Sequence, residues 1–317
     1  MGRYVLRRLV QTLPLLVGIS IASFAILKAA PGGPLAAYEA NPYVTAEDME
    51  RLERAFGLDQ PLHVQYVSWI TKFAAGDWGH SYAYHQPVLD LILERLPNTL
   101  YLMGTVFLTV LVLAIPIGLL TALRQYSFFD HVVTGATFAF LSTPTFWLGL
   151  LLIIVFGLQL GWFPLGGMAT PGAPFDLGDR LRHLVLPVAT LSLVQVGSHV
   201  RYLRASMLET INQDYIRTAR AKGMPERVVV LRHALKNAAI PLVTVVALDL
   251  PEIFVGALVT EQIFGWPGMG RLFWDAATRF DYPVLMGILA VSSTLIVFAN
   301  LLADVTYGYL DPRIRFA

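Results

Sequence analysis

Two carboxylates lie inside a long apolar run in the second half of the chain. Asp249 and Glu252 are three residues apart, so a helix places both on one face, and Pro251 stands between them. A charged side chain inside a membrane helix is costly and normally faces a polar cavity or a charged partner. The pair therefore predicts either the wall of a polar pathway or hydrogen bonds to a neighbouring helix, and the sequence leaves both interpretations open.

A polar stripe runs along an earlier apolar run. Ser192, Gln195 and His199 follow one another at the spacing of a single helix face. Such side chains hydrogen-bond to neighbouring membrane helices, and they also line polar pathways. We therefore treat Ser192, Gln195, His199 and the two carboxylates as candidate pathway residues, with helix packing as the competing interpretation.

The densest positive charge lies in a loop between two apolar runs. Attraction to lipid headgroups explains a basic loop by itself. The order of residues indicates more, because Asp214 is suited to cap a helix at Tyr215–Lys222 and Gly223 is suited to end it in the left-handed conformation. Pro225 then fits the first turn of a second helix. The basic residues of the loop are Arg217, Arg220, Lys222, Arg227, Arg232 and Lys236.

The first predicted helix of this loop has only about two turns. A helix this short is unstable alone in water. It must therefore dock, either onto the ends of the chain's own membrane helices or into a groove on a partner.

Composition requires that lipid surrounds much of the molecule. Of the 317 residues, 56% are hydrophobic and 14% are charged, whereas soluble domains are about 25% charged. The net charge of +1 gives no global field for nucleic acid, so no nucleic-acid partner is expected. The absence of cysteine excludes disulfides, thiolate nucleophiles and cysteine-bound metals.

Motifs for enzymatic chemistry are missing from the sequence. No Gly-Lys dipeptide occurs, so the phosphate-binding loop of an ATPase is absent, and we expect no cofactor in this chain. The seven histidines lack metal-binding spacing, and surface positions explain His80 and His85 better than a weak metal site does. We expect neither a catalytic residue nor a metal ion.

The apolar runs predict an all-α integral membrane protein with six transmembrane helices. Each run is long enough to cross a hydrocarbon core of about 30 Å. Several contain proline, which membrane helices tolerate. The first run is longer than the apolar part of a typical signal peptide, so we expect it to remain as an anchor. The predicted spans are 9–29, 100–123, 134–160, 184–207, 238–262 and 283–308.

The distribution of Lys and Arg predicts the orientation of these spans. With a cytoplasmic N-terminus, the inner segments hold fourteen basic residues and the two short outer loops hold four. Both termini are therefore expected in the cytoplasm, and the basic loop is expected on the same side.

The segment between the first two spans is predicted to form an external helical cap. Three short amphipathic helices are expected, the first after Thr45, the second with Pro61 as its first residue and the third near Pro87. Their apolar faces suit packing on the membrane part rather than an independent domain. The predicted organisation is a transmembrane helix at 1–30, a cap at 31–97, and a five-helix core at 98–317 with a cytoplasmic loop at 208–237.

Several stretches resemble one family of transporters. The loop sequence NQDYIRTARAKGMPERVVVLRHALKNAAIPLV (212–243) is similar to the cytoplasmic signature loop of permease subunits in binding-protein-dependent ABC importers, in the dipeptide, oligopeptide and nickel branch. The long segment after the first span is similar to the first of the two permease types in such systems. Other similar stretches are GLDQPLHVQYVSWI (57–70), GDWGHSY (76–82), STPTFWLGLLLI (142–153), EQIFGWPGMGRL (261–272) and DPRIR (311–315).

The resemblance implies a non-catalytic permease subunit that forms half of a translocation pathway for dipeptides or oligopeptides in a prokaryotic cell membrane. Residues 214–224 would be a coupling helix that fits a cleft on a cytoplasmic ATPase. The implied partners are a second related permease, two cytoplasmic ATPase subunits that bind ATP and Mg, an external substrate-binding protein and membrane lipid. The implied coupling residues are Asp214, Tyr215, Ile216, Arg217, Thr218, Ala219, Arg220, Ala221, Lys222 and Gly223.

The loop also departs from the general permease pattern. Only Ala219, Gly223 and Leu235 fit that pattern, so the short helix and its glycine carry the resemblance better than any single charge. The branch moves dipeptides, longer peptides, nickel complexes and some oligosaccharides, and the sequence does not select among them. An ion- or proton-coupled secondary transporter that uses Asp249 and Glu252 as proton sites is the alternative.

Overall fold

The computed structural model of the chain describes residues 2–29, 35, 43–255 and 257–310. The terminal stretch DPRIR lies outside the described residues. Regular structure in the described part is helical, apart from one isolated β-bridge between His80 and Pro87. The predicted all-α fold is confirmed.

Packing divides the chain into two units, which are described separately. Helices α5 (Val88–Leu123) and α15 (Tyr282–Leu310) contribute residues to both. The predicted boundaries at residues 30 and 97 stay predictions. Unit 1 contains Met1–Thr99 and Pro267–Phe298, and unit 2 contains Leu100–Trp266 and Ala299–Ala317.

Unit 1 buries one apolar cluster, to which α5, α14 and α15 contribute. The helices of this unit are α1 (Gly2–Ala29), α3 (Ala46–Ala55), α4 (Leu62–Ala74), the first part of α5, α14 (Met269–Thr278) and the first part of α15. The buried residues of the cluster are Val88, Leu91, Ile92, Met269, Leu272, Ala276, Val284, Leu285 and Ile288.

The two short helices α3 and α4 begin close to the predicted positions. The Thr45 hydroxyl accepts a hydrogen bond from the Asp48 backbone N–H at 3.2 Å, and the Asp48 carboxylate accepts one from the Thr45 backbone at 3.1 Å. This reciprocal cap satisfies two N–H groups that the first turn leaves unpaired. The second prediction was off by one residue, since Pro61 caps α4 rather than beginning it.

The predicted third short helix and the second span are one helix. α5 runs unbroken for 36 residues across Pro97, whereas we expected the cap to end at residue 97 and a separate span to begin at residue 100. Val88, Leu91 and Ile92 are buried near its start, and the buried stripe continues at Leu102. Continuous burial along one face offsets the hydrogen bond that Pro97 cannot donate.

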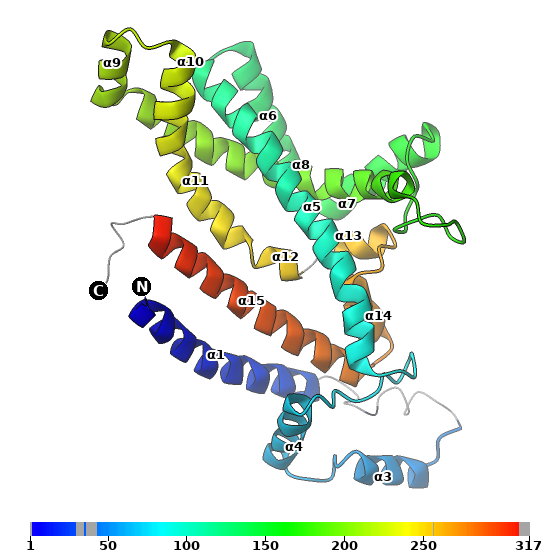
Figure 1. The fold of residues 1–317 in the computed structure, drawn as a ribbon. Coiled ribbons are helices and arrows are strands. Elements are labelled where there is room, and N and C mark those ends of the chain that lie inside the picture. Colours follow the sequence, from blue (N-terminus) through cyan, green and yellow to red (C-terminus); the bar gives the residue numbers. More distant parts are fainter. Residues whose placement is uncertain (1, 30–34, 36–42, 256, 311–317) are drawn as a thin grey trace. The chain divides into compact units, whose positions relative to one another are not determined.

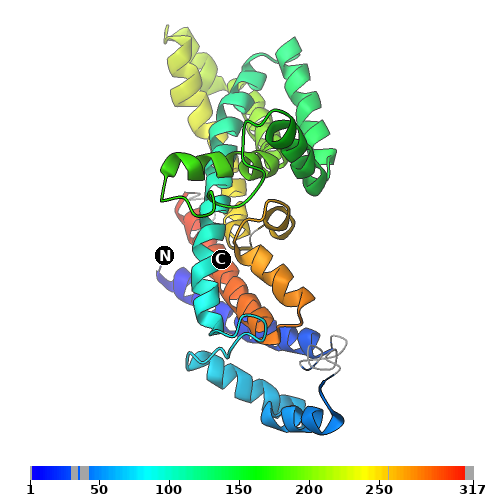
Figure 2. The ribbon, with the colours of Figure 1, turned by 90° about the vertical axis from the view of Figure 1, so that its right-hand side faces the viewer.

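Unit 2 is organised around the long helix α8, which packs against α6, α7 and α11. Figures 1 and 2 show the short helices α9 and α10 at one end of this unit, close to the start of α11. The helices of unit 2 after α5 are α6 (Phe128–Ser142), α7 (Thr145–Leu152), the π-helix η2 (Ile153–Gln159), α8 (Leu177–Ile211), α9 (Asp214–Ala221), α10 (Glu226–Val228), the π-helix η3 (Val229–Ala234), α11 (Leu235–Asp249), α12 (Glu252–Val255), α13 (Leu258–Ile263) and the last part of α15.

The number of membrane spans agrees with the prediction only when a bent pair is counted as one. Five helices of the described part are long and apolar enough to cross a membrane, and α6 with α7–η2 makes a sixth. The span predicted at 134–160 is a bent pair rather than a single helix, because these helices meet at an angle of 106°. Thr143 is extended ahead of Pro144, since proline disfavours a helical residue before it.

The bounds predicted for the fifth span, 238–262, are wrong. The apolar helical stretch begins earlier, at Glu226, and ends at Phe254. Regular α-helix stops at Asp249, and the following residues form the separate short helices α12 and α13. Pro251 lacks the N–H that would continue the helix at this point.

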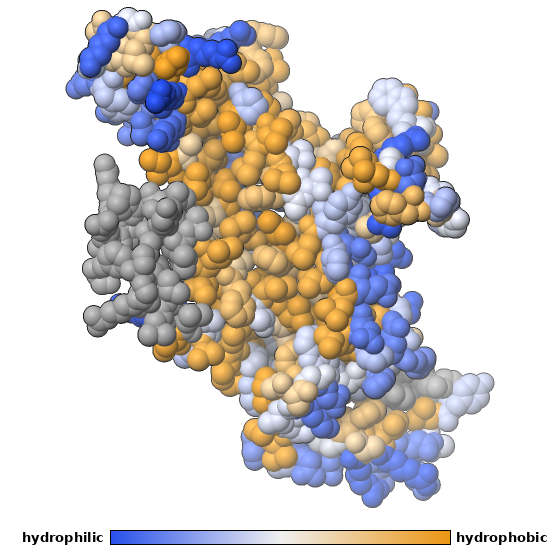
Figure 3. Space-filling view, viewed as in Figure 1, coloured by the Kyte–Doolittle hydropathy of each residue, from blue (hydrophilic) through white to orange (hydrophobic). Residues whose placement is uncertain are grey.

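The surface of unit 2 is divided by polarity. Apolar side chains cover the outer faces of α5 and α11, and hydrophilic side chains gather around α9 (Figure 3). Exposed apolar residues of α5 include Leu108 and Val112, and those of α11 include Ile240 and Leu248. Since water would not favour so much exposed apolar surface along two helices, these faces are suited to lipid.

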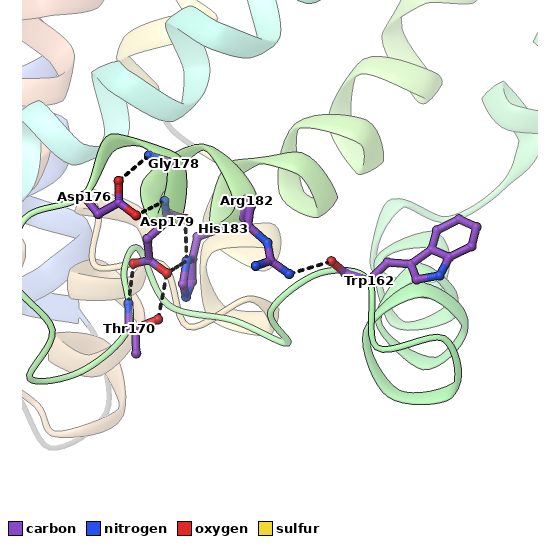
Figure 4. A network of polar contacts seen from close by, with 7 residues as sticks. All are labelled: Trp162, Thr170, Asp176, Gly178, Asp179, Arg182 and His183. Atoms are coloured by element: carbon purple, nitrogen blue, oxygen red, sulfur yellow. Dashed lines mark hydrogen bonds and ion pairs between the residues drawn. The ribbon is translucent and has the colours of Figure 1, made fainter.

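The loop that precedes α8 is tied to the first turns of that helix (Figure 4). The Asp179 carboxylate accepts hydrogen bonds from the backbone N–H and the hydroxyl of Thr170, both at 2.7 Å. Arg182 donates to the backbone oxygen of Trp162 at 3.1 Å. Asp176 caps the helix by accepting from the backbone N–H of Gly178 at 2.9 Å.

Candidate coupling helix and intramembrane polar site

The short helix predicted in the basic loop is present as α9, shifted by one residue. Asp214 does not cap it, contrary to our prediction, because Gln213 occupies the cap position and makes no side-chain cap hydrogen bond. Asp214 is instead the first helical residue, where its negative charge favours the positive end of the helix dipole. Its exposed carboxylate lies 3.4 Å from Arg217.

The inner face of α9 is apolar and packs on its own unit. Ile216 is fully buried and Ala219 is 7% exposed. They share one core cluster with Leu203 and Met207 of α8 and with Leu242 of α11. We expected Ala219 on the surface that meets a partner, and this is wrong, because positions three apart on a helix face the same way and Ile216 points inward. This burial stabilises a helix too short to persist alone.

The outer face of α9 is exposed. It carries Tyr215, Arg217, Thr218, Ala221 and Lys222. Tyr215 is 44% exposed although it has a large ring. Asp214, Arg220 and Gly223 are exposed as well, so of the ten predicted coupling residues only Ile216 and Ala219 are buried.

The end of α9 has the predicted glycine. Gly223 has a φ of 72°, and a Cβ placed on it would meet no atom within 4 Å. The glycine is therefore required by backbone conformation and not by lack of space. Its backbone N–H donates to the Arg220 carbonyl at 2.9 Å, and α10 begins directly after Pro225.

An ion pair that we did not predict braces this turn. Arg220 donates two hydrogen bonds to the Glu226 carboxylate, at 3.1 and 2.7 Å, and so joins α9 to α10. The hydrogen bonds to Glu226 raise the pKa of the Arg220 guanidinium. The sequence does show these opposite charges six residues apart, on either side of Gly-Met-Pro. They come together because Gly223 turns the chain in the left-handed conformation.

A second unpredicted pair joins α6 to α8. Arg204 donates to both oxygens of Asp130, at 2.9 and 2.7 Å, and Asp130 is only 3% exposed. The same carboxylate accepts from the backbone N–H of Tyr126, which has a φ of 63°. This bidentate contact fixes the start of α6 against the part of α8 that leads to α9.

The polar side chains predicted on the fourth and fifth spans meet between α8 and α11. His199 Nε2 donates to the Asp249 carboxylate at 2.6 Å. His199 Nδ1 lies 3.2 Å from the carbonyl oxygen of Gln195. Both ring nitrogens therefore face acceptor oxygens, an environment that suits an imidazolium paired with a carboxylate.

Glu252 lies beside this pair at a small cavity of about 10 Å³. Gln195, His199 and Asp249 line the same cavity, together with apolar residues of α5 such as Phe107. Glu252 is exposed and has no hydrogen-bond partner among the residues that the structure describes. Room for about one water molecule and an unpaired carboxylate make this a polar site that a partner or a ligand can complete.

Ser192 lies apart from the other four candidate pathway residues. Its side chain is 2% exposed, and its hydroxyl has no hydrogen-bond partner within the described part of the chain. It does not line the cavity with Gln195. The structure thus brings together four of the five residues and leaves this one inside the packing of α8.

Helices that can span a membrane, with a short and partly exposed helix in the loop between two of them, define a multi-pass helical membrane protein. Residues 114–316 match the family described as binding-protein-dependent transport system inner membrane component, and residues 1–103 match the N-terminal part of such components. The chain belongs to the family of binding-protein-dependent transport system inner membrane components.

Curated relatives are similar over the whole length. The oligopeptide transport system permease protein AppB of Bacillus subtilis is 44% identical over 317 residues, covering 100% of both chains. The dipeptide transport system permease protein DppB of Escherichia coli is 34% identical over 336 residues, covering 99% of both chains. The di/tripeptide transport system permease protein DppB of Pseudomonas aeruginosa is 36% identical over 334 residues and 98% of both chains.

The chain is therefore a permease subunit of a binding-protein-dependent ABC importer in a bacterial cell membrane. Membership in this family implies an ATPase and a substrate-binding protein as partners. It does not favour the alternative of a proton-coupled secondary transporter.

Proposed function

We propose that this chain forms half of the pathway that carries dipeptides or oligopeptides into the cell, with a second related permease forming the other half. The names of the similar permeases support peptide as the substrate class. The chain itself is non-catalytic in this proposal. Two cytoplasmic ATPase subunits bind ATP and Mg, and an external binding protein delivers the peptide.

The two faces of α9 carry this proposal. One face is buried against α8 and α11 through Ile216 and Ala219, while Tyr215, Arg217 and Thr218 are exposed. A helix that served only as a basic anchor for lipid headgroups would need charge but no buried inner face. A helix that receives motion from a partner needs both an exposed surface and a rigid attachment.

The attachment leads directly to the intramembrane polar site. The core beneath α9 contains Leu203 of α8 and Leu242 of α11, and the same two helices carry His199 and Asp249. Motion of α9 would therefore act on both helices that hold the polar pair. In our proposal, closure of the ATPase subunits moves α9, and the resulting shift between α8 and α11 changes access to the site at Glu252.

Gly223→Val tests the coupling role. Valine is strained at positive φ, so the end of α9 should move while the apolar spans insert normally. We expect near-normal amounts in the membrane, loss of peptide uptake, and either loss of ATPase co-purification or unproductive ATP hydrolysis. Gly172→Val is the matched control, because Gly172 also has positive φ and open space around it but lies in another loop. Full uptake in Gly223→Val would reduce this loop to a basic anchor.

The proposed orientation can be tested separately, because the chain lacks cysteine. A cysteine at Gly172 should react with an impermeant thiol reagent added to intact cells. A cysteine at Gln213, beside α9, should react only after the membrane is opened. Labelling at Gln213 from outside would place α9 away from the ATPase and contradict the coupling proposal.

A further inference from the structure

Unit 1 contains an aromatic-lined cavity that the proposed function does not use. Its volume is about 360 Å³, and it lies between the end of α1, helix α4 and the start of α15. Phe24, Trp69, Phe73, Trp78 and Tyr282 contribute to its walls. The rings of Phe73 and Trp78 stack with centroids 4.4 Å apart, so part of this wall is rigid and apolar.

A narrower cavity of about 170 Å³ adjoins the first and follows α1. The two share Trp69, Phe73 and Met286. The wide cavity reaches Lys28 and the narrow one reaches Leu16. Lys28 and Leu16 lie about 18 Å apart along the helix, at 1.5 Å per residue. Since half of a hydrocarbon core is about 15 Å thick, the two cavities together match the depth of one lipid leaflet.

The walls of the narrow cavity suit hydrocarbon. Ser20 and Tyr66 hydrogen-bond to each other through their hydroxyls at 2.8 Å. Ser293 and Thr294 donate to backbone carbonyls one turn earlier in α15, at 2.6 and 2.7 Å. These hydroxyls are already satisfied by the protein, and the remaining surface is largely apolar, so an acyl chain fits it better than a polar ligand does.

The wide cavity carries positive charge at its rim. Lys28 is half-buried, lies 5.8 Å from the centre of the Phe24 ring, and has no carboxylate partner among the described residues. Lys72 lines the same cavity. Asp77 also lines it and accepts a hydrogen bond from the backbone of Gly79 at 3.1 Å. A half-buried ammonium without a counter-ion is costly, so this rim favours an anion.

We propose that the two cavities bind one anionic glycerophospholipid. Its phosphate lies near Lys28 and Lys72, and one acyl chain fills the narrow cavity between α1 and α15. Tryptophan and tyrosine around the headgroup are at their preferred depth, the membrane interface. The lipid would also hold α1 in place, since only 11% of its apolar stretch is buried by protein. The site does not depend on the identity of the transported substrate.

Native mass spectrometry of the full-length chain, purified with its co-expressed partners from phosphatidylglycerol or phosphatidylcholine nanodiscs, tests this site. Phosphatidylglycerol should remain bound in preference to phosphatidylcholine. Lys28→Ala should lower phosphatidylglycerol retention about fivefold, the effect of one basic residue at a membrane surface. Lys236→Ala, which removes an exposed lysine far along the sequence, should leave retention unchanged.

A second variant tests the acyl chain separately from the charge. Ser293→Leu narrows the smaller cavity without adding charge, so it should lower retention of both lipids. Equal retention in Lys28→Ala and Lys236→Ala, or no preference for the anionic lipid, would overturn the proposal. Cross-linking of a Ser23→Cys chain to the second permease would also overturn it, because a protein helix would then occupy the narrow cavity.

Discussion

Helix α9 and the intramembrane polar site both involve the helices α8 and α11, but they place charged and apolar side chains in opposite ways. At α9, Ile216 and Ala219 face inward and charged side chains face outward. In the span, His199 and Asp249 face each other between the two helices, and apolar side chains such as Leu248 are exposed. The solvent explains the difference, because water hydrates charges at α9 and lipid does not hydrate them in the span.

The two ion pairs of these regions should therefore differ in importance. The Arg220 and Glu226 side chains are 40% and 59% exposed. His199 and Asp249 are 7% and 27% exposed. An exposed pair contributes roughly 0–1 kcal/mol, whereas removing one partner of a buried pair leaves a poorly solvated charge and costs about 3–5 kcal/mol. Apolar burial should therefore contribute most of the stability at α9, and the ion pair should contribute more in the span.

Ile216→Ala should have the largest effect at α9. The side chain is fully buried, so truncation should cost about 2–5 kcal/mol of local packing. Since 1.4 kcal/mol is about tenfold in an equilibrium constant, we expect ATPase co-purification and peptide uptake to fall roughly tenfold or more at unchanged membrane level. Ile240→Ala, the same truncation at an exposed position of α11, is the matched control and should retain ATPase binding. Wild-type uptake in Ile216→Ala would show that packing does not hold the helix.

His199→Leu and Asp249→Leu should each lower the yield of assembled importer. Asp249 is partly exposed, so each single variant should lose less stability than a variant of a fully buried pair would. We expect a loss of about 1–3 kcal/mol for each. The double variant removes both charges and should recover yield. If the site belongs to the pathway, uptake in the double variant stays low despite the recovered yield. Recovery of both yield and uptake in the double variant would show that the pair serves helix packing alone.

Glu252→Gln separates the pathway from packing more directly. Glu252 has no hydrogen-bond partner among the described residues, so the change should leave yield near normal. Altered uptake would then come from the site and not from assembly. Normal uptake at normal yield would remove Glu252 from the candidate pathway residues.

The sequence predicted what depends on local pattern. Hydrophobic length predicted the apolar spans, and the glycine predicted the left-handed end of α9. The helical spacing of polar residues predicted that Gln195 and His199 face one site, although Ser192 of the same stripe does not line it and Asp249 and Glu252 reach it from separate helices. Each of these features follows from a few consecutive residues and the geometry of a helix.

The remaining features depend on contacts between distant segments. The inward direction of Ala219 depends on the apolar surface that α8 and α11 offer, which local sequence does not specify. The chain bends at Pro144, whereas α5 continues unbroken through Pro97. Local sequence does not specify this difference either. Proline permits both outcomes, and burial on the two sides of it decides between them. The Asp130–Arg204 pair could not be predicted from the sequence either, because 74 residues separate its partners.

The smallest effect is expected for the brace between α9 and α10. Arg220→Ala should weaken the turn by roughly 0–1 kcal/mol, because both side chains of the pair are partly exposed and the apolar core beneath α9 remains. Uptake should fall by less than about fivefold, and the loss should shrink as salt rises, since salt screens the intact pair. The exchange variant Arg220→Glu with Glu226→Arg should recover part of the loss if the pair acts as a brace. If the exchange fails to recover uptake while Glu226→Ala alone is harmless, Arg220 contacts the ATPase directly. The charge of Arg220 would then be part of the surface that docks on the ATPase. The C-terminal end of α9 would share the arrangement of the rest of the helix, with an apolar inner face and a polar outer face.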